Sequence, residues 1–279
     1  MELRDVGRRY GVRGRWVLKD VGLRVPGGAL LRVEGGNGSG KSTLLRLLAG
    51  IDAPSAGRIT GRPRTAYVPE RFPAALPLTA LGYLTRLGRI HGLGRRTADR
   101  AARDWLERFD AGRYAHRPLR ELSKGTAQKV AVAQGLVGAP ELLVLDEAWT
   151  GLDDDSRRVL DRAVLDRVAG GGAVVFVDHD PRRLAGKCRS VHRVEDGRLV
   201  AVAAGPRARV PRVRVEAEGA GPPPDGLPGD PLLERLPGAV RLTVAAADSD
   251  ALLHALLTAA PPWHIRSVTA APAPEEPHR

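Results

Sequence analysis

A glycine-rich segment near the N-terminus carries the clearest chemical pattern in the sequence. Residues 35–42 read Gly-Gly-Asn-Gly-Ser-Gly-Lys-Ser, which matches the phosphate-binding pattern G-x-x-x-x-G-K-[ST] in full. Glycines let the backbone wrap closely around phosphate groups with its N–H groups pointing inward. In this pattern Lys41 reaches the β- and γ-phosphates and the Ser42 hydroxyl binds Mg²⁺. We therefore expect a triphosphate site lined by Gly35, Gly36, Asn37, Gly38, Ser39, Gly40, Lys41, Ser42 and Thr43.

Two carboxylates follow an apolar run later in the chain. The run at 142–145 is Leu-Leu-Val-Leu, and Asp146 and Glu147 come directly after it. Ligands of an open α/β sheet bind at the carboxyl ends of its strands, so a buried strand would deliver both groups to the site. We assign Mg²⁺ binding to Asp146 and catalysis to Glu147, which would orient and deprotonate the attacking water. Such a run alone is a common strand end, but beside a phosphate loop it indicates hydrolysis.

The elements predicted around the glycine loop are those that a phosphate site requires. Residues 1–34 alternate apolar and polar in short runs with a Pro-Gly-Gly break at 26–28, which is typical of strand, turn and strand. The second strand leads into the loop, and leucines with helical spacing follow between 44 and 48. Strand, loop and helix therefore come in the expected order.

The middle of the chain predicts a helical insertion followed by buried strands. Apolar residues have helical spacing from about 78 to 138. The short runs at 142–145 and 173–177 indicate buried parallel strands, with a helix near 154–168 between them. We therefore predict an α/β core with a helical subdomain at about 71–138.

The composition shifts after Gly205, where we place a small C-terminal accessory domain, residues 206–279. A Pro/Gly-rich stretch at 219–231 interrupts two alternating runs that predict strands, and a helix near 251–257 and a strand near 263–268 follow. This order indicates a small βαβ-like unit of α+β type. The last residues, 271–279, have the composition of a disordered tail.

Composition limits the classes of partner. The net charge is +12, but 39 of the 44 basic residues are arginine in a chain rich in Ala, Gly and Pro, which we interpret as a compositional bias. We therefore expect no nucleic-acid partner. No apolar run approaches the roughly 18 residues of a spanning helix, and the N-terminus lacks the plan of an export signal, so we expect a cytoplasmic chain. The single cysteine, Cys188, can form no internal disulfide.

Further motifs in a fixed order give the sequence a family resemblance. Leu122-Ser123-Lys124-Gly125-Thr126 is similar to the L-S-G-G-Q signature of the ATP-binding cassette (ABC) family, and Thr150-Gly151-Leu152-Asp153 resembles its D-loop. His179, after the run at 173–177, resembles the family's switch histidine. Together with the two motifs above, these cover residues 1–205. The resemblance implies a P-loop NTPase core with a mixed sheet and an antiparallel β subdomain.

The resemblance also implies roles for individual residues. Ser123 and Gly125 would contact ATP bound to a second subunit, and Asp153 would reach across the dimer. His179 would contact the γ-phosphate as a catalytic group beside Lys41 and Glu147. Tyr10 is the expected aromatic platform for adenine, with Trp16 as the alternative.

Two motifs depart from the family's pattern. Glu70 stands where the family has the glutamine of the Q-loop; it can still bind Mg²⁺ or its water, but it adds a negative charge. Lys124 replaces a signature glycine and Thr126 replaces the signature glutamine, which alters the contact to ATP in the second subunit. Neither change removes the lysine, the acidic pair or the histidine, so we expect hydrolysis to be retained.

The function that the resemblance implies is an ATP-hydrolysing subunit, with ATP and Mg²⁺ as cofactors, that drives a transporter. Its partners would be a second nucleotide-binding subunit, in a homodimer or with a similar chain, and a separate transmembrane permease contacted near residues 70–76 at the cytoplasmic face of the cell membrane. The Y-V-P-E-R-F-P stretch and the C-terminal extension resemble stand-alone subunits of six-span exporters, which favours export. An importer subunit, a soluble ABC ATPase acting on nucleic acid or ribosomes, and a regulatory module with little turnover are the alternatives.

Overall fold

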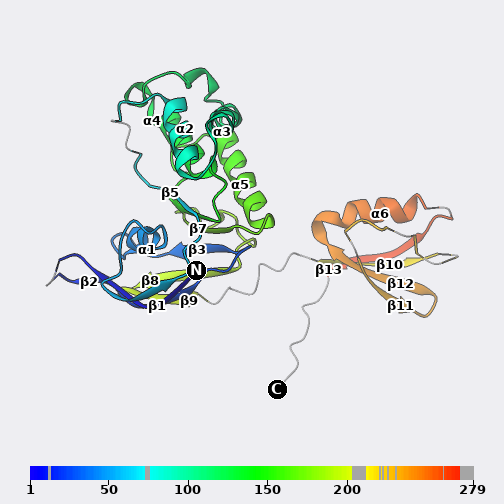
Figure 1. Ribbon diagram of the computed structural model, residues 1–279. Coiled ribbons are helices and arrows are strands. Elements are labelled where there is room, and N and C mark those ends of the chain that lie inside the picture. The colour runs from blue at the N-terminus through cyan, green and yellow to red at the C-terminus, as the bar shows by residue number, and fades with distance from the viewer. Residues whose placement is uncertain are drawn as a thin grey trace. The chain divides into compact units, whose positions relative to one another are not determined.

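The protein consists of two compact units, residues 1–204 and 205–279 (Figure 1). The computed structural model describes the ranges 1–11, 14–72, 76–202, 212–219, 221, 223–224, 226–229, 231–259 and 261–270. The tail predicted to be disordered, 271–279, lies outside them.

A six-stranded mixed sheet forms the centre of the first unit. Its strand order is β5-β6-β7-β3-β8-β9, and all neighbours are parallel except β8 and β9. The strands are β3 (Leu30–Glu34), β5 (Thr65–Val68), β6 (Leu142–Asp146), β7 (Ala173–Val177), β8 (Ser190–Glu195) and β9 (Arg198–Val202). The two apolar runs predicted as buried parallel strands are β6 and β7, which lie side by side.

Each face of this sheet is covered by a different layer, which explains why β6 and β7 are apolar throughout. On one face, Leu143 and Leu145 of β6 pack into a core that includes the helical subdomain. On the other face, Leu142 and Val144 pack against α1 (Lys41–Leu48) and the antiparallel sheet. That second sheet has the order β2-β1-β4 and contains β1 (Glu2–Arg9), β2 (Trp16–Arg24) and β4 (Ala56–Thr60).

The remaining helices of the first unit are α2 (Ala80–Ile90), α3 (Arg95–Arg108), α4 (Lys124–Leu136) and α5 (Asp154–Ala169), with short 3₁₀ turns at Gly112–Tyr114 and Leu119–Glu121. Figure 1 shows α2, α3 and α4 gathered in one helical group beyond the end of β5. Thr79 caps α2 by accepting a hydrogen bond from the Gly82 N–H at 3.1 Å. The mixed sheet, the antiparallel β subdomain and the helical insertion agree with the predicted fold class.

The second unit is a four-stranded antiparallel sheet covered by one helix. Its strand order is β11-β12-β10-β13. The elements are β10 (Arg212–Glu218), β11 (Leu232–Leu236), β12 (Ala239–Ala245), a 3₁₀ turn at Ala246–Asp248, α6 (Ser249–Leu257) and β13 (His264–Ala270). Leu252 and Leu256 of α6 pack on Val215, Leu242 and Trp263 in a separate core. Sequence reasoning missed β11, because its residues follow directly on a Pro/Gly-rich stretch.

Candidate functional site

The glycine loop joins β3 to α1 in a backbone form that glycine alone adopts readily. Gly35, Gly38 and Gly40 have φ values of +144°, +77° and +109°. A Cβ atom on Gly35 would lie 2.7 Å from Ser39 Oγ and 2.8 Å from the Val194 carbonyl oxygen, so no larger residue fits there. At Gly36 and Gly38 an added Cβ would meet nothing within 4 Å in the described structure. The loop is therefore closed on its inner side and open on its outer side.

The charged end of the Lys41 side chain contacts the glycine loop. Its Nζ donates to the carbonyl oxygens of Gly35 at 2.8 Å and Gly36 at 2.9 Å, and the residue is 9% exposed. The N-terminus of α1 has no side-chain cap and no acidic residue in its first turn among the described residues. A lysine and an uncapped helix N-terminus together suit a phosphate ligand.

Asp146 lies at the carboxyl end of β6, next to the start of α1. It is 3% exposed, and it accepts a hydrogen bond from the Tyr67 hydroxyl at 3.0 Å. Burial raises the pKa of Asp146 above its usual value, while the nearby Ser42 and Tyr67 hydroxyls oppose that rise. A hydroxyl beside a buried carboxylate offers oxygen ligands of the kind that Mg²⁺ prefers.

The described residues do not form a complete metal cage of their own. No group of three or more His, Cys, Asp or Glu side chains in that part of the chain is placed to hold a metal ion. If Mg²⁺ binds here, Ser42 and Asp146 would supply two oxygen ligands and leave the others to water and phosphate. This fits Mg²⁺, which commonly binds through one or two carboxylates together with substrate phosphates.

Glu147, the residue after Asp146, has a left-handed backbone conformation that residues other than glycine rarely adopt. Its φ is +52°, its N–H donates to the Val177 carbonyl at 3.0 Å, and its Oε1 lies 2.7 Å from His179 Nε2. Burial raises the pKa of Glu147; the charges of Glu70 and Asp146 add to this rise, and His179 opposes it. A carboxylate with a raised pKa, held by a histidine, is suited to accept a proton from water.

Glu70 lies close enough to this group to act on it electrostatically. Its negative charge contributes to raising the pKa values of Tyr67, Asp146 and Glu147. The pKa of the Tyr67 phenol is raised chiefly by burial, and next by the charge of Asp146. Sequence reasoning missed Tyr67; its place three residues before Glu70, on the strand beside β6, was the available signal.

Tyr10 is connected to the residue that follows Ser42. Its hydroxyl donates to Asp52 Oδ2 at 3.0 Å and lies 3.3 Å from Thr43 Oγ1. The Arg8 guanidinium lies 4.7 Å from the centre of its ring, which is 46% exposed. The alternative platform, Trp16, is 37% exposed and has the Arg9 guanidinium 4.9 Å from its ring.

Ser123, Gly125 and Asp153 form a second group. Ser123 caps α4 by accepting from the Thr126 N–H at 3.2 Å, and Asp153 caps α5 by accepting from the Ser156 N–H at 2.8 Å. Lys129 Nζ of α4 lies 2.7 Å from Asp153 Oδ2, an ion pair that the sequence did not predict. This pair lowers the pKa of Asp153. Among the described contacts, the Lys129–Asp153 pair joins the starts of α4 and α5, and no side-chain bond joins Ser123 or Asp153 to the glycine loop.

Comparisons with known proteins agree with this architecture. A family model described as ABC transporter matches residues 18–150. The zinc import ATP-binding protein of Cereibacter sphaeroides is 41% identical over 174 residues, covering 60% of this chain and 69% of that protein. The macrolide export ATP-binding/permease protein of Paracoccus denitrificans is 36% identical over 223 residues, covering 72% of this chain and 33% of that protein. A solved ATP binding subunit of an ABC transporter matches with TM-score 0.66 at 26% identity, covering 71% of this chain and 87% of that one. The chain therefore belongs to the ABC transporter family, as an ATP-binding subunit that hydrolyses ATP.

Proposed function

We propose that the edge of the sheet where β3, β6 and β7 end is the site of Mg²⁺-dependent ATP hydrolysis. The observation that carries this proposal is the convergence there of three contacts: Lys41 over the glycine loop, Tyr67 on Asp146, and His179 on Glu147. Bound Mg²⁺ would neutralise charge on the β- and γ-phosphates, with Ser42 and Asp146 holding it and Glu70 beside it.

Residues of this chain would carry out the remaining steps of hydrolysis. Lys41 binds the phosphate oxygens, and the backbone N–H groups of the loop hold the rest of the triphosphate. Glu147 orients a water molecule and accepts a proton from it. A bond then forms between that water oxygen and the γ-phosphorus, while the bond from the γ-phosphorus to the bridging oxygen breaks and ADP leaves. His179 holds Glu147 in place through Nε2, and with ATP bound that N–H would turn to donate to the γ-phosphate.

The second group of residues supports the proposal that two copies of the chain act together. Ser123, Gly125 and Asp153 lie at the starts of α4 and α5, and no described contact joins Ser123 or Asp153 to the glycine loop. A twofold pairing would bring this group of one subunit to the loop of the other and give two composite sites. ATP would hold the pair closed, and hydrolysis would let it open.

The proposed work is movement of a substrate through a permease on a separate chain, at the cytoplasmic face of the membrane. Within the described residues, every helix is too short or too polar to cross a bilayer. The permease would contact the segment 70–76, of which 73–75 lie outside the described residues. We propose export as the direction, by analogy with stand-alone exporter subunits; relatives named for import and for export both match this chain.

Substitution of Glu147, the proposed general base, tests the assignment of the site. Glu147→Gln keeps the shape of the side chain but cannot accept the proton, so ATPase turnover should fall about 10²- to 10⁴-fold while ATP binding persists. The variant should elute as a dimer when ATP and Mg²⁺ are present. Glu121→Gln, at an exposed position, is the matched control and should leave turnover unchanged. Turnover by Glu147→Gln at the wild-type rate would refute the site.

The direction of transport is tested in a separate experiment, with the chain and its permease placed together in vesicles. ATP added outside reaches only those complexes whose ATPase faces outward, and for them export means accumulation of substrate inside the vesicle. Depletion of substrate preloaded in the vesicle would instead assign import.

A further inference from the structure

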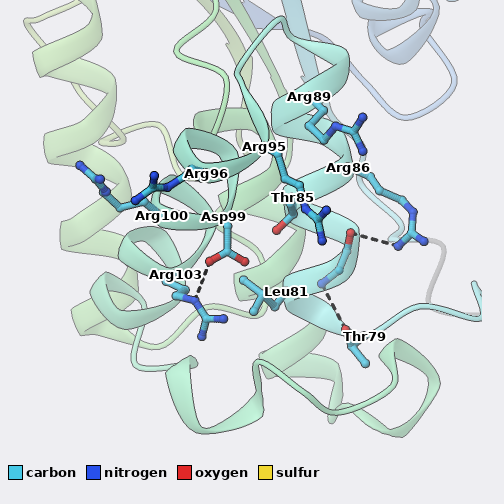
Figure 2. A pocket seen from close by; sticks show the side chains of 11 residues that line it. Thr79, Leu81, Thr85, Arg86, Arg89, Arg95, Arg96, Asp99, Arg100 and Arg103 are labelled. Atoms are coloured by element: carbon cyan, nitrogen blue, oxygen red, sulfur yellow. Dashed lines mark hydrogen bonds and ion pairs between the residues drawn. The ribbon is translucent and has the colours of Figure 1, made fainter.

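A groove lined by arginines lies on the helical subdomain, away from the ATP site. It occupies about 970 Å³ between α2 and α3. Residues 79–103 contain six arginines and one acidic residue, Asp99, so this segment carries five of the chain's twelve net positive charges. The six arginines, all of which line the groove, are Arg86, Arg89, Arg95, Arg96, Arg100 and Arg103 (Figure 2). We call these six the α2–α3 arginine surface.

Most of these guanidinium groups have no anionic partner in the described part of the chain. Arg103 is paired with Asp99 at 2.9 Å, and Arg86 donates to the Gly82 carbonyl at 3.3 Å. No described carboxylate pairs with the other five arginines, and all six side chains are exposed. Arg96 and Arg100 are also four residues apart on one helix, a spacing at which like charges destabilise the helix. The surface therefore carries a concentrated charge that the described fold does not neutralise.

Packing does not account for the arginines. The faces of α2 and α3 that hold the subdomain together are apolar: α2 buries Ala80, Leu81, Leu84 and Gly88, and α3 buries Ala98, Ala102 and Leu106. The arginines occupy the other faces, in contact with solvent. The positive charge of these arginines therefore suits binding to an anion outside the chain.

The turn between the two helices adds an apolar tip to this surface. Ile90, the last residue of α2, is 76% exposed and lies between Arg89 and Arg95 in the sequence. A second hollow of about 650 Å³ joins Ile90 and Leu93 to three of the arginines. An exposed aliphatic side chain surrounded by cations suits the boundary of an anionic bilayer, where the cations meet phosphates and the apolar group enters the acyl region.

We propose that the α2–α3 arginine surface binds the anionic phospholipid headgroups of a membrane directly. The basicity that composition alone attributed to a general bias is, in this segment, a local feature of the fold. Surfaces that bind single-stranded nucleic acid combine cations with aromatic rings on which bases stack. Here the exposed apolar residue is an isoleucine, which favours lipid. The contact goes beyond the proposed function, because it requires neither nucleotide nor permease.

Co-sedimentation of the full chain with vesicles tests this inference. Binding should be strong to vesicles of phosphatidylcholine mixed with phosphatidylglycerol and weak to phosphatidylcholine alone. Binding to the anionic vesicles should weaken as salt is raised, since salt screens exposed charges. Each arginine near an anionic surface contributes about fivefold to binding, so Arg89→Gln with Arg95→Gln should lower it about 25-fold. Ile90→Ser keeps every charge and should lower binding up to about tenfold.

Arg58→Gln with Arg62→Gln is the matched control, because both positions are exposed in the same unit and the double change removes the same charge. It should bind anionic vesicles like the wild type, and all variants should keep the wild-type ATPase rate. Equal losses in the control pair and the groove pair would overturn the inference, as would equal binding to the two kinds of vesicle. Tighter binding to duplex DNA than to anionic vesicles, at matched phosphate concentration, would reassign the surface to nucleic acid.

Discussion

The hydrogen bond from Tyr67 to Asp146 gives the sharpest test of the metal site. Tyr67→Phe removes one oxygen atom and leaves the ring packing unchanged. The bond that it removes is 3.0 Å long and ends on a carboxylate that is 3% exposed, so water cannot readily replace the donor. A hydrogen bond to a charged group stabilises by about 1.5–3 kcal/mol.

The expected effect is on Mg²⁺ affinity. Without the Tyr67 donor the pKa of Asp146, already raised by burial, rises further, and protons compete better with the metal. The carboxylate also loses the group that orients it. We expect the Mg²⁺ concentration for half-maximal ATPase activity to rise about 10- to 100-fold, which is the usual effect of losing an outer-shell partner. The rate at saturating Mg²⁺ should stay near that of the wild type, and the shift should be larger at lower pH.

Tyr83→Phe is the matched control for this measurement. Burial raises the pKa of Tyr83 to about 12, and its phenol bonds to Gln134 in the helical subdomain rather than to Asp146. The control should lose stability without changing the Mg²⁺ dependence. The reasoning is refuted if Tyr67→Phe needs no more Mg²⁺ than the wild type, or if both variants shift alike.

Three further predictions follow from the site. Glu70→Gln removes a charge that raises the pKa of Glu147, so the fall of kcat toward acid pH should move to lower pH; a profile identical to the wild type would contradict this. Asp153→Ala should cost about 1 kcal/mol of unfolding free energy through loss of the helix cap, measured by denaturant titration at neutral pH. Because the folded-state pKa of Asp153 is lowered, its charge stabilises the fold above its ordinary pKa and loses that effect as pH falls through the lowered value; a difference from wild type that stays constant into acid would count against the Lys129 pair. Gly35→Ala should abolish binding of a fluorescent ATP analogue, since its Cβ would collide with Ser39 Oγ and the Val194 carbonyl; unimpaired binding would mean that the loop tolerates a side chain.

Local pattern was sufficient to predict the core of the fold. The runs that form β6 and β7 are apolar at every position because both faces of the sheet are covered, and the glycine loop has one stereochemical solution between a strand and a helix. The order of these segments in the sequence therefore predicted where they lie in the structure. The predicted helix near 154–168 is α5 (Asp154–Ala169), and Asp153 caps its N-terminus.

Contacts between distant segments could not be predicted in this way. The bond from Tyr67 to Asp146, which are 79 residues apart, depends on the register that pairs Tyr67 with Val144, and a single sequence gives no register between distant strands. The pairing of Lys129 with Asp153 depends likewise on how α4 packs on α5. The arginine groove forms where α2 and α3 lie side by side, so the net charge of the whole chain did not point to it.

The bonds between α4 and the turn after β6 have a mechanical consequence. Lys129 holds Asp153 at one end of that turn, and Gln128 Nε2 donates to the Ala148 carbonyl at 3.1 Å at the other end. Ala148 is the immediate neighbour of Glu147. A displacement of α4 along the sheet would therefore act on the backbone next to Glu147, the residue that we propose as the general base.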